Sequence, residues 1–404
     1  MSHSLSNQQL LAAANSFGTP LYVYDAANIE AQYNALTTAF AGQDVKFFYA
    51  SKALTNINIL KLMRNIGCAI DCSSINEAHL AIKAGHAPEN ILYTSNGIHF
   101  SEIETAVSLG IHVNIDSLSN LEKFGKKFGS SYPVGIRLRP NIMAGGNLKI
   151  STGHDKSKFG VPLEQLDQLL TIVETHNINI AGLHIHTGSE IKDVSVFMKV
   201  TEVFFDLVPK FPTLQFLDLG GGFKVPYKAG DASTNIPALA SEIQKFQEKL
   251  KNTYGRGFEL WFEPGKYMVS KSGYFITEVN VIKQTPTITF AGVNSGFNHL
   301  IRPMFYEAYH EIKNLSNPDG ALNVYDVVGN ICETDTFASD RQIATIREGD
   351  LLVFENAGAY GFEMASNFNS RYKPAEVLII NGEAKLIRQR DTFEDLTRNQ
   401  VEVL

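Results

Sequence analysis

The sequence predicts an α/β fold in which a (β/α)8 TIM barrel is joined to a C-terminal, mostly β domain that is β-barrel-like. Between about residues 45 and 265, eight short apolar runs alternate with stretches that carry apolar residues at helical spacing. After about residue 272 the helical spacing fades, and strand-like runs separated by Gly, Pro and Asn follow one another. A doubly wound open sheet is the structural alternative for the first part.

The barrel strands are expected where short apolar runs meet turn residues. These runs cover residues 45–52, 68–73, 91–95, 112–117, 134–140, 181–189, 216–222 and 259–265. Stretches such as NINILKLMRNIG and INEAHLAIKAG lie between them and predict amphipathic helices. Ser74 with Glu77, and Ser101 with Glu104, have the spacing of a capping box at a helix start.

The C-terminal part carries further strand candidates. They cover residues 274–283, 287–293, 323–329, 350–355 and 375–380. The run at 21–29 is also strand-like, and it is a candidate partner for the C-terminal sheet. We therefore expect a barrel domain over residues 30–271 and a β domain made of residues 1–29 and 272–404.

Composition excludes several classes of protein. The 404 residues suffice for a large core, and the net charge of −7 lacks the basic excess of a nucleic-acid binder. Three cysteines without a CxxC pair indicate no disulfide framework and favour a reducing compartment. No apolar run approaches the roughly 18 residues of a membrane span, and the first residues lack a signal-peptide pattern. We expect a cytoplasmic protein that binds neither nucleic acid nor membrane.

Polar residues cluster where the predicted barrel strands end, which is where barrel enzymes place their active sites. These residues are Lys52, Asp71, Asp116, Arg137, Arg139, His184, His186, Gly220 to Gly222 and Glu263. Structural polar residues seldom recur so regularly at one end of every strand, so this end of the barrel is the candidate site.

Lys52 directly follows the run FFYAS. One interpretation is a solvated lysine at a helix entrance. The other is a partly desolvated amine that attacks a carbonyl and forms a Schiff base, the attachment that pyridoxal phosphate uses.

The three glycines at 220–222 and Glu263 each have two interpretations. Glycines expose backbone N–H groups that suit a phosphate, although an ordinary flexible turn uses them too. Glu263 precedes Pro and Gly, which turn chemistry explains, but an ionised carboxylate there could also hold a cofactor's ring nitrogen protonated.

His184 and His186 are two residues apart on a predicted strand, so both would face one side. They could be core histidines, a metal pair as in barrel hydrolases, or an imidazole stacked on a planar ring. No other histidine falls clearly at a strand end, so we expect no metal site.

The β domain carries three further motifs. Cys332 and Glu333 could supply an acid and a polar contact, or be a core cysteine beside a solvated glutamate. Small residues surround Tyr360, as where a backbone approaches a ligand closely. Arg302 and Tyr306 offer a guanidinium and a phenol, and a guanidinium binds a carboxylate bidentately, although an exposed arginine is the commoner situation.

Together these motifs resemble the diaminopimelate decarboxylases, a family of the alanine-racemase-like pyridoxal phosphate (PLP) fold. The motifs are YASKA, HIHTGSE, DLGGGF, EPGKY, CETDTF and GAYGFEMASNFNSR, in that order along the chain. The resemblance spans residues 20–380. Several motifs are shared with ornithine and arginine decarboxylases, whereas the last motif and IRPMFYEAYH are much more specific to the diaminopimelate branch.

The resemblance implies a role for each matching residue around PLP. Lys52 would be the Schiff-base lysine, His186 would stack on the pyridine ring, and Glu263 would meet its nitrogen. The other residues expected to contact the cofactor are Asp71, Ser189, Gly221, Gly222 and Tyr360.

The resemblance also implies how the substrate is held. Arg302 and Tyr306 would grip a substrate carboxylate, and Tyr360 would also contact the substrate. Cys332 would be a candidate acid near the reacting carbon, with Glu333 near the distal amino group. The family is a head-to-tail homodimer in which these last two residues complete the partner's site.

The implied activity is the PLP-dependent decarboxylation of meso-diaminopimelate to L-lysine and CO2, the last step of lysine biosynthesis. Lys266 follows EPG where the family commonly has Arg, so its grip on a carboxylate loses the bidentate fork. The alternatives are a same-fold decarboxylase of ornithine, lysine, arginine or a carboxy-polyamine, and, less expected, a racemase. From other classes, a non-catalytic PLP-binding protein and a metal-dependent hydrolase also compete.

Overall fold

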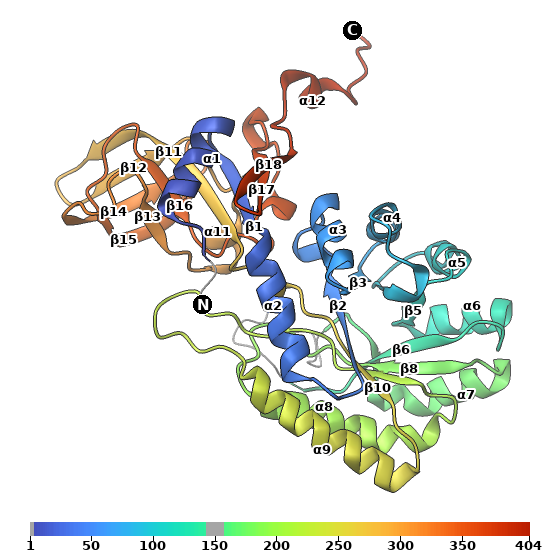
Figure 1. Ribbon diagram of the computed structural model, residues 1–404. Coiled ribbons are helices and arrows are strands. Elements are labelled where there is room, and N and C mark those ends of the chain that lie inside the picture. Colours follow the sequence, from blue (N-terminus) through green and yellow to red (C-terminus); the bar gives the residue numbers. More distant parts are fainter. Residues whose placement is uncertain (1–3, 143–156) are drawn as a thin grey trace. The chain divides into compact units, whose positions relative to one another are not determined.

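The computed structural model describes residues 4–142 and 157–404, and it divides into two units (Figure 1). The barrel unit consists of Gln32–Val225 and Ala232–Tyr267. The β unit consists of Met1–Ala31, Pro226–Asp231 and Met268–Leu404. The segment Pro226–Asp231 leaves the barrel between two of its elements and belongs with the β unit.

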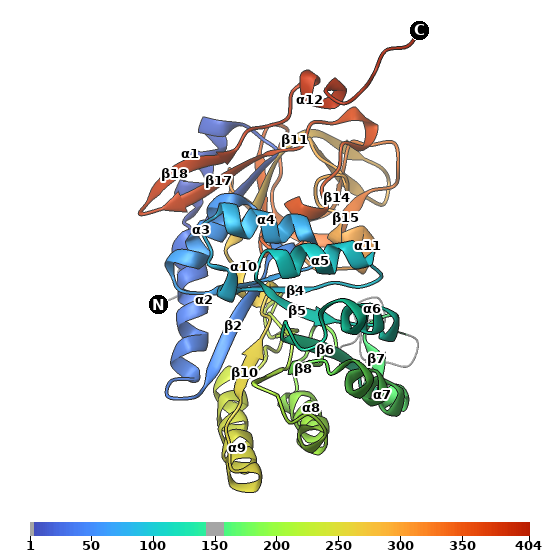
Figure 2. The same cartoon turned by 90° about the vertical axis from the view of Figure 1, so that its right-hand side faces the viewer.

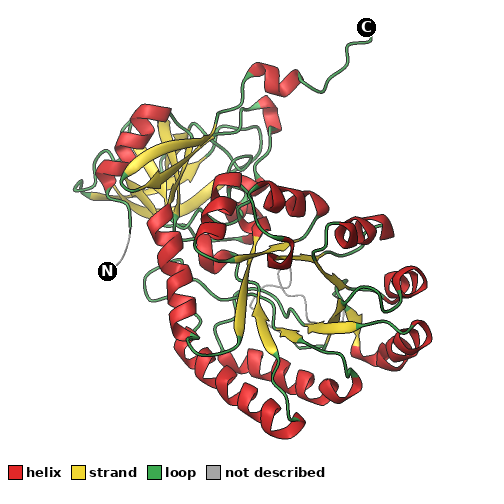
Figure 3. Ribbon diagram, turned by 45° about the vertical axis from the view of Figure 1, so that its right-hand side comes forward, coloured by secondary structure: helices red, strands yellow, loops and turns green. Residues whose placement is uncertain are grey.

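Eight parallel strands close into a barrel within the described residues, which confirms the predicted (β/α)8 architecture. They are β2 (Val45–Ala50), β3 (Ala69–Cys72), β4 (Ile91–Thr94), β5 (His112–Ile115), β6 (Val134–Arg139), β8 (Ile180–His184), β9 (Phe216–Asp218) and β10 (Glu259–Phe262). Each pairs with the next, and β10 pairs with β2 to close the sheet. A two-residue strand, β7 (Val161–Pro162), adds to β6. Figure 3 shows these strands in yellow inside a ring of red helices.

Helices cover the outside of the barrel strands (Figure 2). They are α2 (Ala26–Ala39), α3 (Ile57–Asn65), α4 (Ile75–Lys83), α5 (Phe100–Ser108), α6 (Leu118–Phe128), α7 (Leu166–His176), α8 (Val194–Leu207) and α9 (Ile236–Tyr254). A four-residue helix, α10 (Lys266–Val269), follows the carboxyl end of β10. In α9, the buried Ile236, Leu239, Ile243, Phe246 and Leu250 follow the helical spacing that the sequence shows.

The two predicted capping boxes fare differently. Ser74 caps α4, because its side chain accepts a hydrogen bond from the Glu77 backbone at 3.2 Å. The Glu77 carboxylate accepts from the Ser73 backbone instead of returning to Ser74, so the box is half formed. The second box is wrong, because α5 starts at Phe100 and its cap is the ring of His99, which leaves Ser101 inside the helix.

Aromatic and small residues fill the barrel at the amino ends of its strands. Phe216 and Trp261 stack with ring centroids 3.5 Å apart and planes at 7°. Gly182 makes room for this stack, since a Cβ there would come within 2.0 Å of the Phe216 ring. This aromatic stack fills the barrel below the carboxyl ends of the strands, where the candidate site lies.

The β unit contains one nine-stranded sheet, which confirms the predicted mostly β second part. Its strands are β1 (Leu21–Asp25), β11 (Gly273–Gln284), β12 (Thr289–Val293), β13 (Ile312–Asn314), β14 (Leu322–Val328), β15 (Thr336–Ala344), β16 (Leu351–Phe354), β17 (Ala375–Ile380) and β18 (Glu383–Arg388). Its helices are α1 (Asn7–Phe17), α11 (Arg302–Tyr306) and α12 (Phe393–Thr397). The strand β1 pairs antiparallel with β11 and parallel with β17, so the run at 21–29 does contribute a strand to the C-terminal sheet.

A core of apolar side chains joins α1 to the sheet. Leu10, Ala13 and Ala14 of the helix pack with Val23 of β1 and Val377 of β17. None of the helices in the described part of the chain combines the length and hydropathy that a membrane span needs.

Candidate active site

Every barrel strand with a polar end stops earlier than its sequence run suggested. Lys52 does not end β2 but lies in a short 3-10 turn, Ser51–Ala53, that follows it. Likewise β8 ends at His184, so His186 lies in the loop beyond it, and the expectation that both rings face one side of the same strand is wrong. Lys52 and His186 thus lie just beyond the last residues of β2 and β8.

Lys52 contacts a buried carboxyl on the next strand. Its Nζ lies 3.1 Å from Asp71 Oδ2, and Asp71 is 1% exposed. Burial and the nearby Glu263 raise the pKa of Asp71 to about 7, while Lys52 opposes the rise. This carboxyl therefore titrates near neutral pH, directly beside the Lys52 amine.

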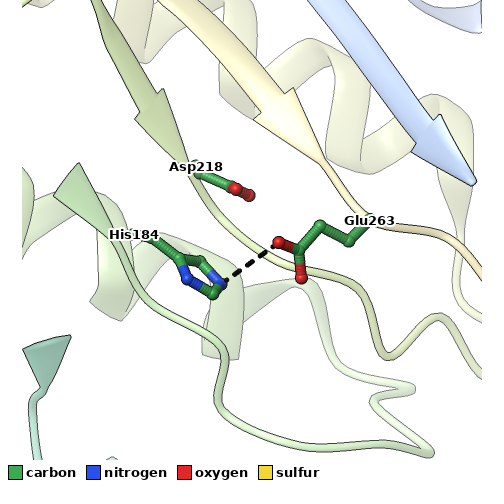
Figure 4. A group of neighbouring side chains, drawn as sticks. All are labelled: His184, Asp218 and Glu263. Atoms are coloured by element: carbon green, nitrogen blue, oxygen red, sulfur yellow. Dashed lines mark ion pairs between the residues drawn. The ribbon is translucent and has the colours of Figure 1, made fainter. Parts of the chain in front are cut away.

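Glu263 lies with His184 and Asp218 at the carboxyl ends of β10, β8 and β9 (Figure 4). A ring nitrogen of His184 and one carboxylate oxygen each of Asp218 and Glu263 all lie within 4.8 Å of one another, and all three side chains are buried. The His184 Nε2 to Glu263 Oε1 distance is 3.5 Å. Burial raises the pKa of Glu263, but His184 and Lys52 outweigh it and hold that pKa well below its usual range.

His186 receives a hydrogen bond from the glycine loop. The Gly221 backbone N–H donates to His186 Nδ1 at 3.1 Å. Burial, and then the charge of Arg137, lower the pKa of His186 to about 3, so the ring is neutral with its proton on Nε2. Among the described residues, the group whose side-chain atoms converge within 4.8 Å contains His184 but not His186.

Close packing requires all three glycines of the loop after β9. A Cβ on Gly220 would lie 2.5 Å from His186 Nδ1, and one on Gly221 would lie 2.2 Å from the Glu263 carbonyl oxygen. At Gly222 the backbone has φ +97° and a Cβ would meet the Gly188 carbonyl oxygen at 2.2 Å. The backbone of this loop is therefore closely packed against its neighbours at all three glycines, unlike the ordinary flexible turn that was the alternative.

Lys266 lies beside Ser189 and a glutamate that the sequence did not single out. Its Nζ is 3.1 Å from Ser189 Oγ and also contacts the Glu190 carboxylate. Lys224 holds the same carboxylate at 3.0 Å. Burial would raise the pKa of Glu190, but the two lysines hold it below its usual value. The carboxylate grip expected of Lys266 stays a prediction, because its partners here are protein groups.

Arg302 is the first residue of α11 and is 5% exposed. Its Nη2 donates to the Tyr227 hydroxyl at 3.1 Å, and this hydroxyl lies 3.2 Å from Ser270 Oγ. Its Nε has no hydrogen-bond partner, and it forms no ion pair with a carboxylate among the described residues. Tyr306 ends the same helix, with its ring 4.6 Å from that of Phe305.

Tyr227 and Ser270 carried no signal in the sequence. Tyr227 follows the glycine loop in a segment without regular structure and reaches the β unit only through tertiary folding. Its partner Arg302 is 75 residues away along the chain.

Cys332 is exposed and is held by one side chain from a distant loop. The Asn369 side chain accepts from the Cys332 backbone at 2.9 Å and donates to Cys332 Sγ at 3.2 Å. Glu333 is exposed beside it. The alternative of a core cysteine is therefore wrong, because Cys332 is exposed to solvent in the single chain.

The small residues around Tyr360 allow two backbone segments of the protein to pack closely against each other. A Cβ on Gly358 would lie 1.9 Å from the Val269 carbonyl oxygen, and one on Gly273 would lie 2.1 Å from the Gly358 Cα. Tyr360 itself has φ +56° and is half-buried. Close approach of two chain segments thus accounts for the glycines, and a ligand contact by Tyr360 stays a prediction.

Comparisons with known proteins agree with this geometry. Residues 26–270 match the family described as pyridoxal-dependent decarboxylase, pyridoxal binding domain. Diaminopimelate decarboxylase of Methanothermobacter thermautotrophicus is 38% identical over 96% of this chain and 92% of its own. That of Campylobacter jejuni is 35% identical over 94% and 95%.

Solved structures give the same result. The diaminopimelate decarboxylase of Helicobacter pylori complexed with L-lysine has a TM-score of 0.88 and 31% identity over 97% of this chain and 98% of its own. A lysine/ornithine decarboxylase of Vibrio vulnificus has a TM-score of 0.81 at 21% identity over 94% and 100%, which shows a shared fold alone. The chain belongs to the diaminopimelate decarboxylase family of pyridoxal-dependent decarboxylases.

Proposed function

We propose that this chain decarboxylates meso-diaminopimelate to L-lysine and CO2, the last step of lysine biosynthesis. The observation that carries the substrate choice is Arg302, a 5% exposed guanidinium that meets a phenol and no carboxylate among the described residues. A buried cation without an anion is costly, so it needs an anionic ligand. A second substrate carboxylate supplies one, whereas the distal ammonium of ornithine or lysine would be repelled.

The barrel residues fit PLP. An amine at Lys52 suits the aldehyde, the anionic Glu263 suits the ring nitrogen, and the neutral His186 suits the ring face. For the phosphate, the fitted glycine backbone lies next to Ser189 and Lys266. Buried carboxyl oxygens on Asp71 and Glu263 that lack a donor among the described residues support a ligand at this end of the barrel.

When bound, PLP supplies an acceptor for the electrons that the departing carboxylate leaves on the substrate carbon. Lys52 would hold the cofactor by its ε-amino group and release it to the substrate amine, with Asp71 taking or returning a proton at Lys52 Nζ. The Glu263 carboxylate would keep the ring nitrogen protonated, because an anion beside it favours the cationic form.

The remaining site residues keep their predicted roles as part of the proposal. Arg302 and Tyr306 would hold the carboxylate that is not lost, and Tyr360 would contact cofactor and substrate. Cys332 would return a proton to the reacting carbon, and Glu333 would meet the distal amino group. Lys266 would contact the substrate or, as its place beside Ser189 suggests, the cofactor phosphate.

We further propose a cytoplasmic homodimer, with the domain division 30–271 against 1–29 and 272–404. The exposure of Cys332 and Glu333 supports shared sites, because a reacting acid must be shielded from water and a second subunit could shield it. Mixing two inactive variants, Lys52→Ala and Cys332→Ala, tests this: shared sites restore part of the activity, and separate sites restore none.

The activity is tested by CO2 release from the PLP-loaded protein. The panel holds meso-diaminopimelate, L-lysine, L-ornithine, D-ornithine and L-arginine. Turnover of diaminopimelate alone, with L-lysine as product, supports the proposal. Release only from a substrate with one carboxylate would keep fold and cofactor but make the chain a lysine, ornithine or arginine decarboxylase, and no release from any member would favour a non-catalytic PLP-binding protein.

A further inference from the structure

Two carboxyls face each other at the carboxyl ends of β9 and β10, and only one of them has a place in the proposed mechanism. Asp218 is completely buried, and Glu263 is 6% exposed. One atom of each, together with a ring nitrogen of His184, lies within 4.8 Å of the others (Figure 4). Asp218 therefore needs an explanation of its own.

The hydrogen-bond donors of the described residues do not satisfy this pair. Asp218 Oδ1 accepts from the Gly220 backbone at 2.9 Å. Asp218 Oδ2 and Glu263 Oε1 are buried and have no donor among the described residues. The His184 ring approaches Glu263 only at 3.5 Å. Two buried carboxyls this close repel each other when both are charged, which favours a state in which one of them carries a proton.

The surrounding charges decide which carboxyl is protonated. The charged and titratable groups that bear on the pair are Lys52, Asp71, Arg137, His184 and His186. Glu263 is stabilised as an anion by His184 and Lys52. Burial and the charge of Glu263 raise the pKa of Asp218 well above its usual range, and Asp71 adds to this.

We propose that Asp218 is a positioning residue that stays protonated and donates a hydrogen bond to Glu263, so that the Glu263 carboxylate keeps its charge and its direction toward the cofactor's ring nitrogen. The inference rests on the proposed function for that last role only. The protonation of the Asp218 carboxyl does not depend on the cofactor, so it is expected in the cofactor-free protein as well. The His184 ring lies beside the same carboxylate, with its Nε2 3.5 Å from Glu263 Oε1; burial lowers the pKa of His184, and the charge of Glu263 opposes this.

The proton has a measurable consequence for stability. A carboxyl whose pKa is raised in the folded state binds a proton that the unfolded chain gives up near pH 4, so stability falls as the pH rises above about 4. Asp218→Asn keeps a neutral donor and removes this titration. In the cofactor-free full-length protein, the Tm of Asp218→Asn relative to the parent should increase by about 2–4 °C between pH 4 and pH 8.

Asp206 in α8 offers a matched control, because it is exposed and carries the same side chain on the same unit. Asp206→Asn should show a Tm difference from the parent that does not change over this pH range. A difference for Asp218→Asn that is equally flat, or that falls with pH, would overturn the inference. Stabilisation of the parent, but not of Asp218→Asn, by added Zn²⁺ or Mn²⁺ would also overturn it and show a cation site.

Cofactor binding tests the positioning role. Asp218→Leu removes the donor, so it should weaken PLP binding by about 10-fold or more and shift the absorption band of the bound cofactor, whereas Asp218→Asn should stay within about threefold of the parent. Equal losses in both variants would mean that the position needs a charge, which contradicts a protonated aspartate. If the pH trend appears but the parent releases no CO2 from diaminopimelate, the proposed function fails and the protonated aspartate stands.

Discussion

Tyr227 offers a direct test of how Arg302 is prepared for an anion. Its hydroxyl accepts from Arg302 Nη2 at 3.1 Å and lies 3.2 Å from Ser270 Oγ, while its ring is perpendicular to that of His310 with centroids 5.8 Å apart. The Arg302 guanidinium lies 5.4 Å from the centre of the Tyr227 ring. The phenol thus orients the guanidinium and accepts one of its five N–H groups.

Replacing Tyr227 by Phe keeps the ring and removes only the acceptor. A hydrogen bond from a charged donor is worth about 1.5–3 kcal/mol, which corresponds to about 10- to 100-fold in binding. We expect KM for diaminopimelate to rise by about this factor with kcat nearly unchanged, because the contact is the same in the ground state and the transition state. Inhibition by L-lysine, which keeps the second carboxylate, should weaken in parallel, whereas binding of 1,5-diaminopentane should not.

Tyr325→Phe is the matched control for this variant. Tyr325 is also buried in the β unit, and its hydroxyl accepts from the Ile346 backbone at 3.0 Å instead of from a charged side chain. Tyr227→Phe should lose about 1.5–3 kcal/mol of unfolding free energy and Tyr325→Phe about 0.5–1.5 kcal/mol, but only Tyr227→Phe should change KM. An unchanged KM, or a loss confined to kcat, would refute the role of Tyr227 in holding Arg302.

Three further predictions concern other parts of the two units. Lys52→Ala should lower kcat by about 10²- to 10⁴-fold and remove the absorption band of the lysine-bound cofactor; CO2 release near the parent rate would contradict the assignment. Glu190→Gln removes a negative charge that contacts Lys224 and Lys266 and would compete there with the cofactor phosphate. PLP should therefore bind about fivefold more tightly at low salt, in a titration followed by absorbance. Weaker binding would mean that the carboxylate positions the lysines and does not compete with the phosphate. Burial lowers the pKa of His310 to about 3, so the unfolded chain takes up a proton below pH 6.5 that the folded chain refuses, and stability falls as the pH falls from 6.5 toward 3. His310→Asn should lose part of this acid destabilisation in urea unfolding at pH 4 and pH 7, and an identical pH dependence would show that the histidine accepts a proton in the fold.

The barrel could be predicted because its strands are buried on both faces and therefore read as apolar runs. The residues at which these strands end could not be predicted from the sequence. The run at 216–222 was expected to be a strand throughout, but β9 stops at Asp218, because Gly220 and Gly222 take positive φ values that no strand contains. Strand length depends on where the backbone leaves the ladder, which apolar character alone does not record.

Three strands of the β unit escaped prediction for a different reason. β13 has only three residues, and β18 is mostly exposed, so neither shows a clear apolar pattern. β15 reads Thr336–Ala344 with charged residues at its centre. Pairing with neighbouring strands, and not local propensity, makes these segments extended.

The sequence by itself determined the kinds of chemistry at the site, since a lysine, a glutamate and a glycine triplet at successive strand ends can be read without coordinates. Only the tertiary structure decided their partners. Asp71 beside Lys52, Asp218 beside Glu263 and Tyr227 against Arg302 are contacts between residues far apart along the chain. Burial changes the protonation of such side chains, and burial is a property of packing that no spacing in the sequence reveals.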